Sequence, residues 1–287
     1  MPAARPRVVV LPDPDALARE AAELVLEALG RAIERRGRAD AALTGGSSAT
    51  GLFRALAAPE SRGRLQWGRV HLWWGDDRYV PSTHPDSNAG LAYQHLLGIA
   101  ARAGESGEGA GGTDLLAGKV SGLPIPAGNV HPIPVDAAIA RGPDGARWAA
   151  AQYAEELRRA LPVGPGGLPA FDLVLLGVGP DGHILSTFPG SRALAEGAPL
   201  VVAVRAPGHD APHLERVTLN PRFLEAAGRI VVMIPGQAKA AIVRELFGSE
   251  DDPERLPAQL AMRENATWLL DEAAAAELPA EVPASRR

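Results

Sequence analysis

The chain has 287 residues, 46% of them hydrophobic and 22% charged, which is an ordinary globular composition. Its 34 acidic and 29 basic residues are mixed without a basic block, which argues against a nucleic-acid partner. The chain has no cysteine, which excludes disulfides, thiolate nucleophiles and cysteine-bound metals. No stretch approaches the roughly 20 apolar residues of a membrane helix, and no signal-peptide pattern is present. We therefore expect a cytoplasmic protein with no membrane partner.

Strands and helices are predicted to alternate along the chain. Val8–Leu11 is a short apolar run ended by Pro12, which indicates a strand. Apolar residues three and four apart over Asp15–Arg35 predict an amphipathic helix, with Asp13 or Asp15 as its cap and Gly37 after its end. Similar patterns predict strands at Ala41–Thr44, Val70–Trp74, Phe171–Leu176, Leu200–Val204, Ile230–Ile234 and Thr267–Leu270, and helices at Thr50–Ala57, Asp86–Leu97, Ala149–Ala160 and Lys239–Phe247.

This alternation predicts an α/β fold, with a parallel sheet covered by helices on both faces. We expect one domain over residues 1–272, with a solvated, flexible glycine-rich loop at Ala103–Gly118 and a frayed tail at residues 273–287. Ligands of such sheets bind outside the carboxyl ends of the strands. The polar glycine segments all follow strands, so they are expected to converge there.

The first of these segments is Thr44-Gly45-Gly46-Ser47-Ser48, between a predicted strand and a helix. Glycines let the backbone approach a ligand, and N–H groups that open a helix attract an anion. The segment matches neither the GxGxxG nor the GxxxxGK[ST] nucleotide motif. It is either a phosphate loop or an ordinary turn.

The second segment is Gly75-Asp76-Asp77-Arg78, followed later by Ser87-Asn88. Two acids and an arginine at a strand end are compatible with a solvated salt-bridge cluster. The functional interpretation is that Arg78 faces a substrate anion or an oxyanion while an aspartate holds it.

The third segment gives the sharpest signal: a buried strand leads into Gly177-Val178-Gly179-Pro180-Asp181-Gly182-His183. Histidine is the natural general base near neutral pH, and Asp181 lies two positions away, where it can orient the ring. The alternative is a structural histidine bonded to a carbonyl. A histidine in a glycine loop after a buried strand favours the functional interpretation.

Two further cations, Arg216 and Lys239, follow or adjoin apolar runs and are candidate phosphate ligands, although their spacing alone fits solvated charges equally well. No HExxH motif is present, and Pro212 between His209 and His213 argues against a metal-binding histidine pair on a helix. No serine lies in a GxSxG elbow. We expect neither a metal nor a cofactor.

Together these segments resemble the 6-phosphogluconolactonase family, within the wider glucosamine-6-phosphate isomerase/deaminase group. Phe188-Pro189-Gly190, Gly236-Gln237-Ala238-Lys239, Asn129-Val130-His131 and Trp268-Leu269-Leu270-Asp271 also fit, so the resemblance spans nearly the whole chain. Two departures stand out. Asp77 replaces the family's usual glutamate, and Ile184-Leu185 replaces its usual Thr-Ala.

The resemblance implies a modified Rossmann-type fold and hydrolysis of 6-phospho-D-glucono-1,5-lactone to 6-phosphogluconate in the oxidative pentose phosphate pathway. It implies that His183 activates the water, with Asp181 and Arg78 also in the catalytic set and Asp76 supporting Arg78. The implied phosphate-binding residues are Gly45, Gly46, Ser47, Arg216 and Lys239. The implied partner is a small sugar phosphate, and the protein is expected to be a monomer or a weak dimer.

Two other functions stay open. The Gly182-His183-Ile184 triplet also fits a glucosamine-6-phosphate deaminase, but Phe188 stands where that enzyme's pattern has a ring-opening glutamate. A non-catalytic sugar-phosphate sensor on the same fold is the other alternative, against which the presence of Asp181 and His183 argues.

Overall fold

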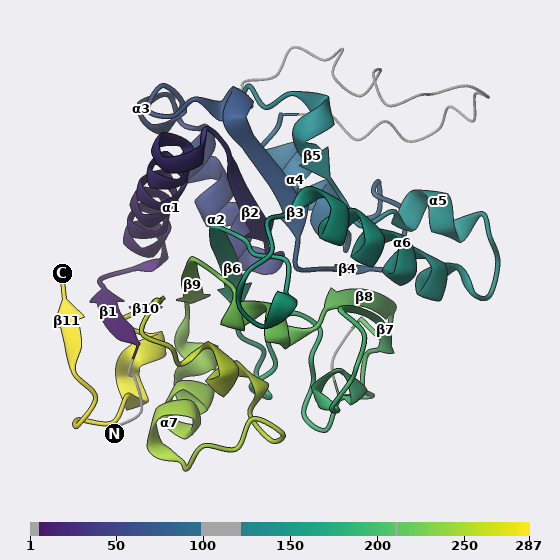
Figure 1. The fold of residues 1–287 in the computed structure, drawn as a ribbon. Coiled ribbons are helices and arrows are strands. Elements are labelled where there is room, and N and C mark those ends of the chain that lie inside the picture. Colours follow the sequence, from purple (N-terminus) through teal and green to yellow (C-terminus); the bar gives the residue numbers. More distant parts are fainter. Residues whose placement is uncertain (1–5, 99–121, 210–211) are drawn as a thin grey trace.

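The computed structural model describes residues 6–98, 122–209 and 212–287. Eight parallel strands form the main sheet, in the order β11-β1-β10-β9-β6-β2-β3-β5 (Figure 1). These strands are β1 (Arg7–Leu11), β2 (Ala39–Leu43), β3 (Val70–Trp74), β5 (Val130–His131), β6 (Leu173–Gly177), β9 (Arg229–Ile234), β10 (Ala266–Asp271) and β11 (Ala284–Arg286). The predicted parallel α/β sheet is confirmed. The proposed loop at Ala103–Gly118 lies outside the described residues.

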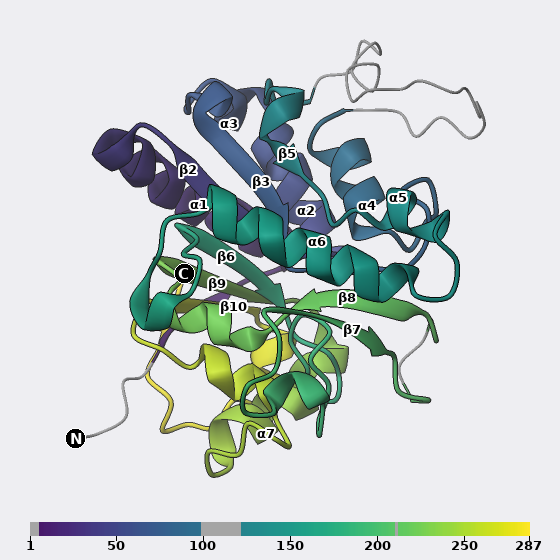
Figure 2. The ribbon, with the colours of Figure 1, turned by 45° about the vertical axis from the view of Figure 1, so that its right-hand side comes forward.

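Helices cover both faces of this sheet. Figure 2 shows α6 crossing in front of the central strands, with α1 and α2 behind them. Tyr153 on α6 is buried and its hydroxyl donates to the carbonyl of Trp74 at the end of β3. The helices are α1 (Pro14–Arg36), α2 (Gly46–Ala57), α3 (Pro59–Arg62), α4 (Asn88–His95), α5 (Val135–Ile139), α6 (Gly145–Ala160) and α7 (Ala240–Gly248). Within the described ranges, none of them combines the length and apolar character needed to cross a bilayer.

Local capping explains several helix boundaries. The Asp13 carboxylate accepts a hydrogen bond from the backbone N–H of Ala16, so Asp13 rather than Asp15 caps α1. Gly37 ends α1 with φ of 75°, a left-handed conformation that glycine adopts without steric penalty. Ser87 caps α4 by accepting from the N–H of Gly90, as its position before the predicted helix suggested.

A second, antiparallel sheet was not foreseen. It has the order β4-β8-β7, with β4 at Asp76–Arg78, β7 at Val201–Arg205 and β8 at Glu215–Leu219 (Figures 1 and 2). The segment Leu200–Val204 was predicted to be a strand of the parallel sheet, which helices cover on both faces. That placement is wrong, because β7 is an edge strand paired with β8 and its middle residues are only partly buried. This small sheet brings β4 and β8 beside the end of the main sheet.

The prediction that the tail from Ala273 frays is also wrong. Ala274 and Ala275 are buried, and β11 pairs in parallel with β1. The reason is that β1 would otherwise be the edge of the main sheet, with unpaired backbone groups that the returning tail satisfies.

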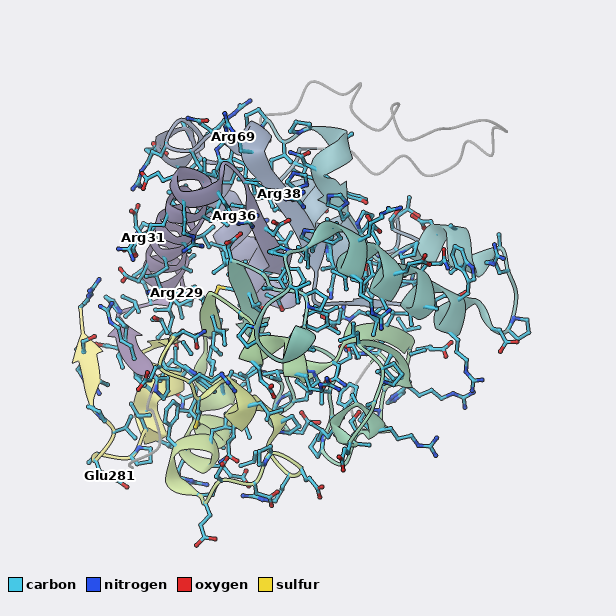
Figure 3. The ribbon with its side chains drawn as sticks, viewed as in Figure 1. Arg31, Arg36, Arg38, Arg69, Arg229 and Glu281 are labelled. Atoms are coloured by element: carbon cyan, nitrogen blue, oxygen red, sulfur yellow. The ribbon has the colours of Figure 1, made fainter. Side chains whose placement is uncertain are left out.

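The amino ends of the strands carry a structural ion-pair network. Arg36 and Arg38 hydrogen-bond to the fully buried Asp40, and Figure 3 shows them with Arg69 at the start of β2 and β3. Burial acts to raise the pKa of Asp40, but hydrogen bonds from Arg38 and Arg36 hold it below its ordinary value. These arginines neutralise a buried acid at the end of the sheet opposite the carboxyl ends of its strands.

Candidate active site

One pocket of about 230 Å³ collects most of the residues singled out from the sequence. It lies at the carboxyl ends of β2, β6 and β9. The neighbouring strands β2 and β6 form a topological switch point, because the strands that follow β2 lie toward one edge of the sheet and those that follow β6 lie toward the other. Such a switch point is where open α/β sheets bind ligands. The predicted site residues that line it are Gly45, Gly46, Ser47, Asp76, Arg78, His183, Arg216 and Lys239.

Asp181 stands just behind this lining and contacts the pocket histidine. Its Oδ1 lies 2.6 Å from Nδ1 of His183, and the same oxygen accepts the backbone N–H of His183 at 3.2 Å. A carboxylate only accepts, so Nδ1 carries the proton and Nε2 is left as the acceptor nitrogen of the ring. The ring is 14% exposed and lies against Phe188, with centroids 4.6 Å apart.

Gly179 permits this close pair. A Cβ added to it would lie 2.1 Å from Nδ1 of His183 and 2.8 Å from Oδ1 of Asp181. Any side chain at this position would occupy the space of the hydrogen bond. The glycine therefore serves close approach of side chains, since its φ lies outside the left-handed region.

The second oxygen of Asp181 has a partner that the sequence did not indicate. Oδ2 lies 2.9 Å from Nε2 of His209, in the segment between β7 and β8. Burial acts to raise the pKa of Asp181, but the hydrogen bonds from His183 and His209 hold it well below its ordinary value. Asp181 is therefore a carboxylate at neutral pH.

The alternation of β4 separates its three charged side chains. Asp76 and Arg78 are two residues apart and line the pocket, whereas Asp77 between them points to the opposite side. Arg78 pairs directly with Arg216 of β8 across the antiparallel ladder. Like charges directly opposite one another repel, so this pair favours an anion between or in front of them.

Arg216 is almost fully buried, at 2% exposure, and its guanidinium carbon lies 5.3 Å from the centre of the Phe188 ring. This contact places a positive charge over an aromatic face, which is a favourable arrangement. Arg78 donates from one terminal nitrogen to the carbonyl of Asp86 at 2.8 Å. Both guanidiniums are thus anchored before any ligand binds.

Asp76 does not hold Arg78 in the way the resemblance implied. In the described structure its carboxylate instead accepts from the hydroxyl of Ser186 at 2.5 Å and from the side-chain amide of Asn88 at 3.3 Å. The reason is geometric, since the Arg78 guanidinium donates to the carbonyl of Asp86 and the Ser186 hydroxyl occupies the Asp76 carboxylate. Asp76 connects the histidine loop to β4.

Asp77 fixes the start of α4 from the other side of the strand. Its carboxylate accepts the backbone N–H groups of Asn88 at 2.6 Å and Ala89 at 3.0 Å, and of Arg78 at 2.8 Å. Burial raises the pKa of Asp77 to about 7, against the lowering effect of these N–H groups. The shorter aspartate at this departure from the family pattern therefore still reaches the helix.

The glycine loop after β2 is packed from below by Asn88. A Cβ on Gly45 would lie 1.8 Å from Oδ1 of Asn88, so a side chain there would break the loop. Gly46 has φ of 83° and begins α2, earlier than the predicted start at Thr50. The first N–H groups of α2 accordingly open onto the pocket, as an anion site requires.

Lys239 enters the pocket from the turn after β9. Its ammonium donates to the carbonyl of Val178 at 2.7 Å. The buried carboxylate of Asp271 accepts the N–H of Gly236 with both oxygens, at 2.9 and 2.8 Å. This contact connects the closing Trp268–Asp271 motif to the Gly236–Lys239 motif.

Residues outside the predicted set also belong to the site. Asn88 and Leu185 line the pocket, and His209 contacts Asp181. Leu185 has a positive φ of 56°, an uncommon conformation for a residue with a side chain, and it packs against Gly75. Asn88 had a signal in the Ser87-Asn88 motif. His209 had none, because nothing in its neighbourhood marks contact with a residue so distant in sequence.

The structure holds other sequence motifs apart from the pocket. His131 of the Asn129–His131 motif lies at the edge of the main sheet, stacked on Trp73 with centroids 4.0 Å apart. Among the described residues, no group of three or more histidine, aspartate or glutamate side chains is arranged to hold a metal ion.

Comparisons with known proteins agree with this architecture. The family model described as glucosamine-6-phosphate isomerases/6-phosphogluconolactonase matches residues 12–269. The chain belongs to this family. It is 35% identical over 274 residues to a 6-phosphogluconolactonase of Mycobacterium tuberculosis, covering 95% of this chain and 98% of that protein.

Solved structures show the same relationship. A 6-phosphogluconolactonase from Trypanosoma brucei superposes with a TM-score of 0.79 at 25% identity, covering 96% of this chain and all of that one. A monomeric glucosamine-6-phosphate deaminase superposes with a TM-score of 0.72 over 94% of this chain and 99% of that chain, at 17% identity. The fold is therefore common to both activities, and the choice between them depends on the site.

Proposed function

We propose that this protein hydrolyses 6-phospho-D-glucono-1,5-lactone to 6-phosphogluconate, the lactonase step of the oxidative pentose phosphate pathway. One observation carries the proposal. An imidazole hydrogen-bonded to a carboxylate at 2.6 Å faces a pocket that also holds two arginines, a lysine and a helix start. A base beside an anion site suits a phosphorylated ester. The names of the relatives, which are similar over nearly their whole length, support the same substrate.

The phosphate would bind to the N–H groups of Gly46 and Ser47 at the start of α2, together with Arg216 and Lys239. Each of these groups is held by the surrounding structure before the ligand arrives. Binding at this end places the lactone carbonyl toward His183. Such positioning uses binding energy to lower the activation barrier of hydrolysis. The effect reaches about 7–11 kcal/mol in well-oriented systems.

His183 acts as the base through Nε2, because Nδ1 is bound to Asp181. Nε2 takes a proton from water as the water oxygen forms a bond to C1 of the lactone. The carbonyl electrons move to oxygen, and Arg78 stabilises the resulting oxyanion. The C1–ring-oxygen bond then breaks, and the imidazolium returns its proton to the departing ring oxygen. The acid formed ionises, so one proton is released per turnover near pH 7.

Asp181 holds the imidazole in the tautomer this sequence of steps needs and stabilises the imidazolium between them. Asp76 orients the neighbouring loop through Ser186. The reaction as written moves only protons and an acyl group between water and substrate.

Deaminase chemistry is the second candidate, because the fold is shared with a glucosamine-6-phosphate deaminase. Opening a sugar ring by acid catalysis would need a carboxylic acid where this chain has Phe188. Phe188 is 5% exposed, and its phenyl ring packs between His183 and Arg216. The site as built therefore favours the lactone over the amino sugar.

The test follows proton release from freshly prepared 6-phosphogluconolactone, with the spontaneous rate subtracted. The wild type should turn the lactone over. His183→Ala should reduce kcat by about 10²–10⁴-fold. His213→Ala, an exposed histidine of the β7–β8 segment, is the matched control and should keep full activity.

Each failure has its own meaning. Ammonia release from glucosamine 6-phosphate, without lactone turnover, would replace the lactonase by the deaminase. Binding of 6-phosphogluconate by a folded wild type that turns over neither substrate would indicate a sugar-phosphate sensor.

A further inference from the structure

Asp181 is shared by two imidazoles, one of which lies outside the pocket lining. Oδ1 faces Nδ1 of His183 at 2.6 Å and Oδ2 faces Nε2 of His209 at 2.9 Å. The Asp181 side chain is 16% exposed, whereas His209 is 59% exposed. A half-buried carboxylate thus connects a shielded ring with one open to solvent.

His209 comes from the connection between two strands of the small antiparallel sheet. It lies after β7 in the segment that leads to β8, and β8 also carries Arg216 of the pocket. The contact with Asp181 therefore joins the small antiparallel sheet to the histidine loop of the main sheet. The contact is made by the imidazole ring, through its Nε2.

We propose that His209 is a positioning residue that shares the Asp181 carboxylate with His183 and, by taking up a proton itself, opposes protonation of the base. This inference rests on the proposed role of His183. Two imidazoles on one carboxylate titrate as a coupled pair, because a proton on either makes the second less favourable. A positive charge on the exposed ring therefore acts, through the shared carboxylate, against a second positive charge on His183.

The other charged groups near His183 do not depend on His209. Among the described residues, the charged groups lining the same pocket are Asp76, Arg78, Arg216 and Lys239. Each belongs to another element and is unchanged by substitution of His209. A change on altering His209 therefore reports the contact through Asp181.

The experiment compares His209→Ala and His209→Gln with the wild type. Alanine removes both the hydrogen bond and the titrating charge, whereas glutamine can still donate an amide N–H to Asp181. The acid limb of the kcat/KM–pH profile should move to higher pH by about half a unit in His209→Ala, a value reduced for solvent screening. His209→Gln should move it in the same direction by less.

A second readout does not depend on turnover. Ring ¹⁵N signals of labelled histidine, followed from about pH 5 to 9 and assigned with His183→Ala, report the titration of His183 directly. The midpoint should rise in His209→Ala, rise less in His209→Gln and stay in place in the control His213→Ala. Because His209 is largely exposed, these variants should fold normally.

The outcomes separate cleanly. An unchanged or lowered midpoint in both His209 variants would overturn the coupling. The predicted graded rise in the ¹⁵N titration supports it even if the wild type proves inactive on the lactone. In that case it is the lactonase proposal that fails, and the Asp181 contact remains.

Discussion

Substitution of Gly179 by alanine tests the geometry of the base directly. The added Cβ would lie 2.1 Å from Nδ1 of His183. The imidazole ring cannot keep its present position at that distance. The φ of Gly179 is outside the left-handed region, so the effect of alanine is argued from the steric contact of its Cβ. The imidazole must rotate away from Asp181, losing both its orientation and its tautomer control. A displacement of about 1 Å in a catalytic group costs about 10²-fold in rate, so we expect kcat to fall by about 10²-fold or more.

The loss should appear in kcat and not in binding. The phosphate ligands lie on other elements, so the affinity for 6-phosphogluconate measured by calorimetry should stay within about threefold, about 0.7 kcal/mol. Gly63→Ala is the control, since a Cβ on Gly63 meets nothing within 4 Å and its φ of −82° suits alanine. A folded Gly179→Ala enzyme with wild-type kcat would refute the claim that the His183–Asp181 contact sets the base.

Three further predictions address other parts of the site. Asp181→Asn should lower kcat by about 10²–10⁴-fold with little change in KM, because the amide no longer enforces the tautomer of His183. Steady-state kinetics measures this change, and an unchanged kcat would exclude the role of Asp181 in orienting His183. Lys239→Met should raise KM for the phosphorylated lactone by about tenfold or more and leave hydrolysis of unphosphorylated gluconolactone unaffected, and equal losses on both substrates would place Lys239 elsewhere in the mechanism. Asp77→Asn should destabilise the fold by about 1–3 kcal/mol in urea unfolding, since a helix N–H group loses its acceptor. With a folded pKa of about 7, above the unfolded value of about 3.9, Asp77 retains protons on folding, so wild-type stability should fall as pH rises between these values and the variant should lose that dependence.

Much of the main sheet was predictable from the sequence. Runs such as Leu173–Gly177 are apolar without alternation because helices cover both faces of the strand, and that pattern is local. The parallel arrangement then follows from alternation with helices, and it places the segments after Leu43 and Gly177 at one end. The pairing of Asp181 with His183 was also within reach, because they are only two positions apart in the sequence.

The second sheet was not predictable in the same way. Its strand β4 has three charged residues, which no hydrophobic pattern marks as a strand, and the pairing of Arg78 with Arg216 depends on register between distant segments. The same holds for the tail, whose pairing with β1 comes from the backbone and needs no apolar side chains.

The fold class, the candidate general base and the glycines around it could be inferred from the sequence, because periodicity and short spacings are local properties of the chain. The tertiary arrangement sets which charges meet. It turned Asp77 toward α4 and Asp76 toward Ser186, set Asn88 beneath Gly45, and brought His209 to Asp181. Such contacts depend on the relative placement of whole elements, to which each residue's immediate neighbours in the sequence contribute little.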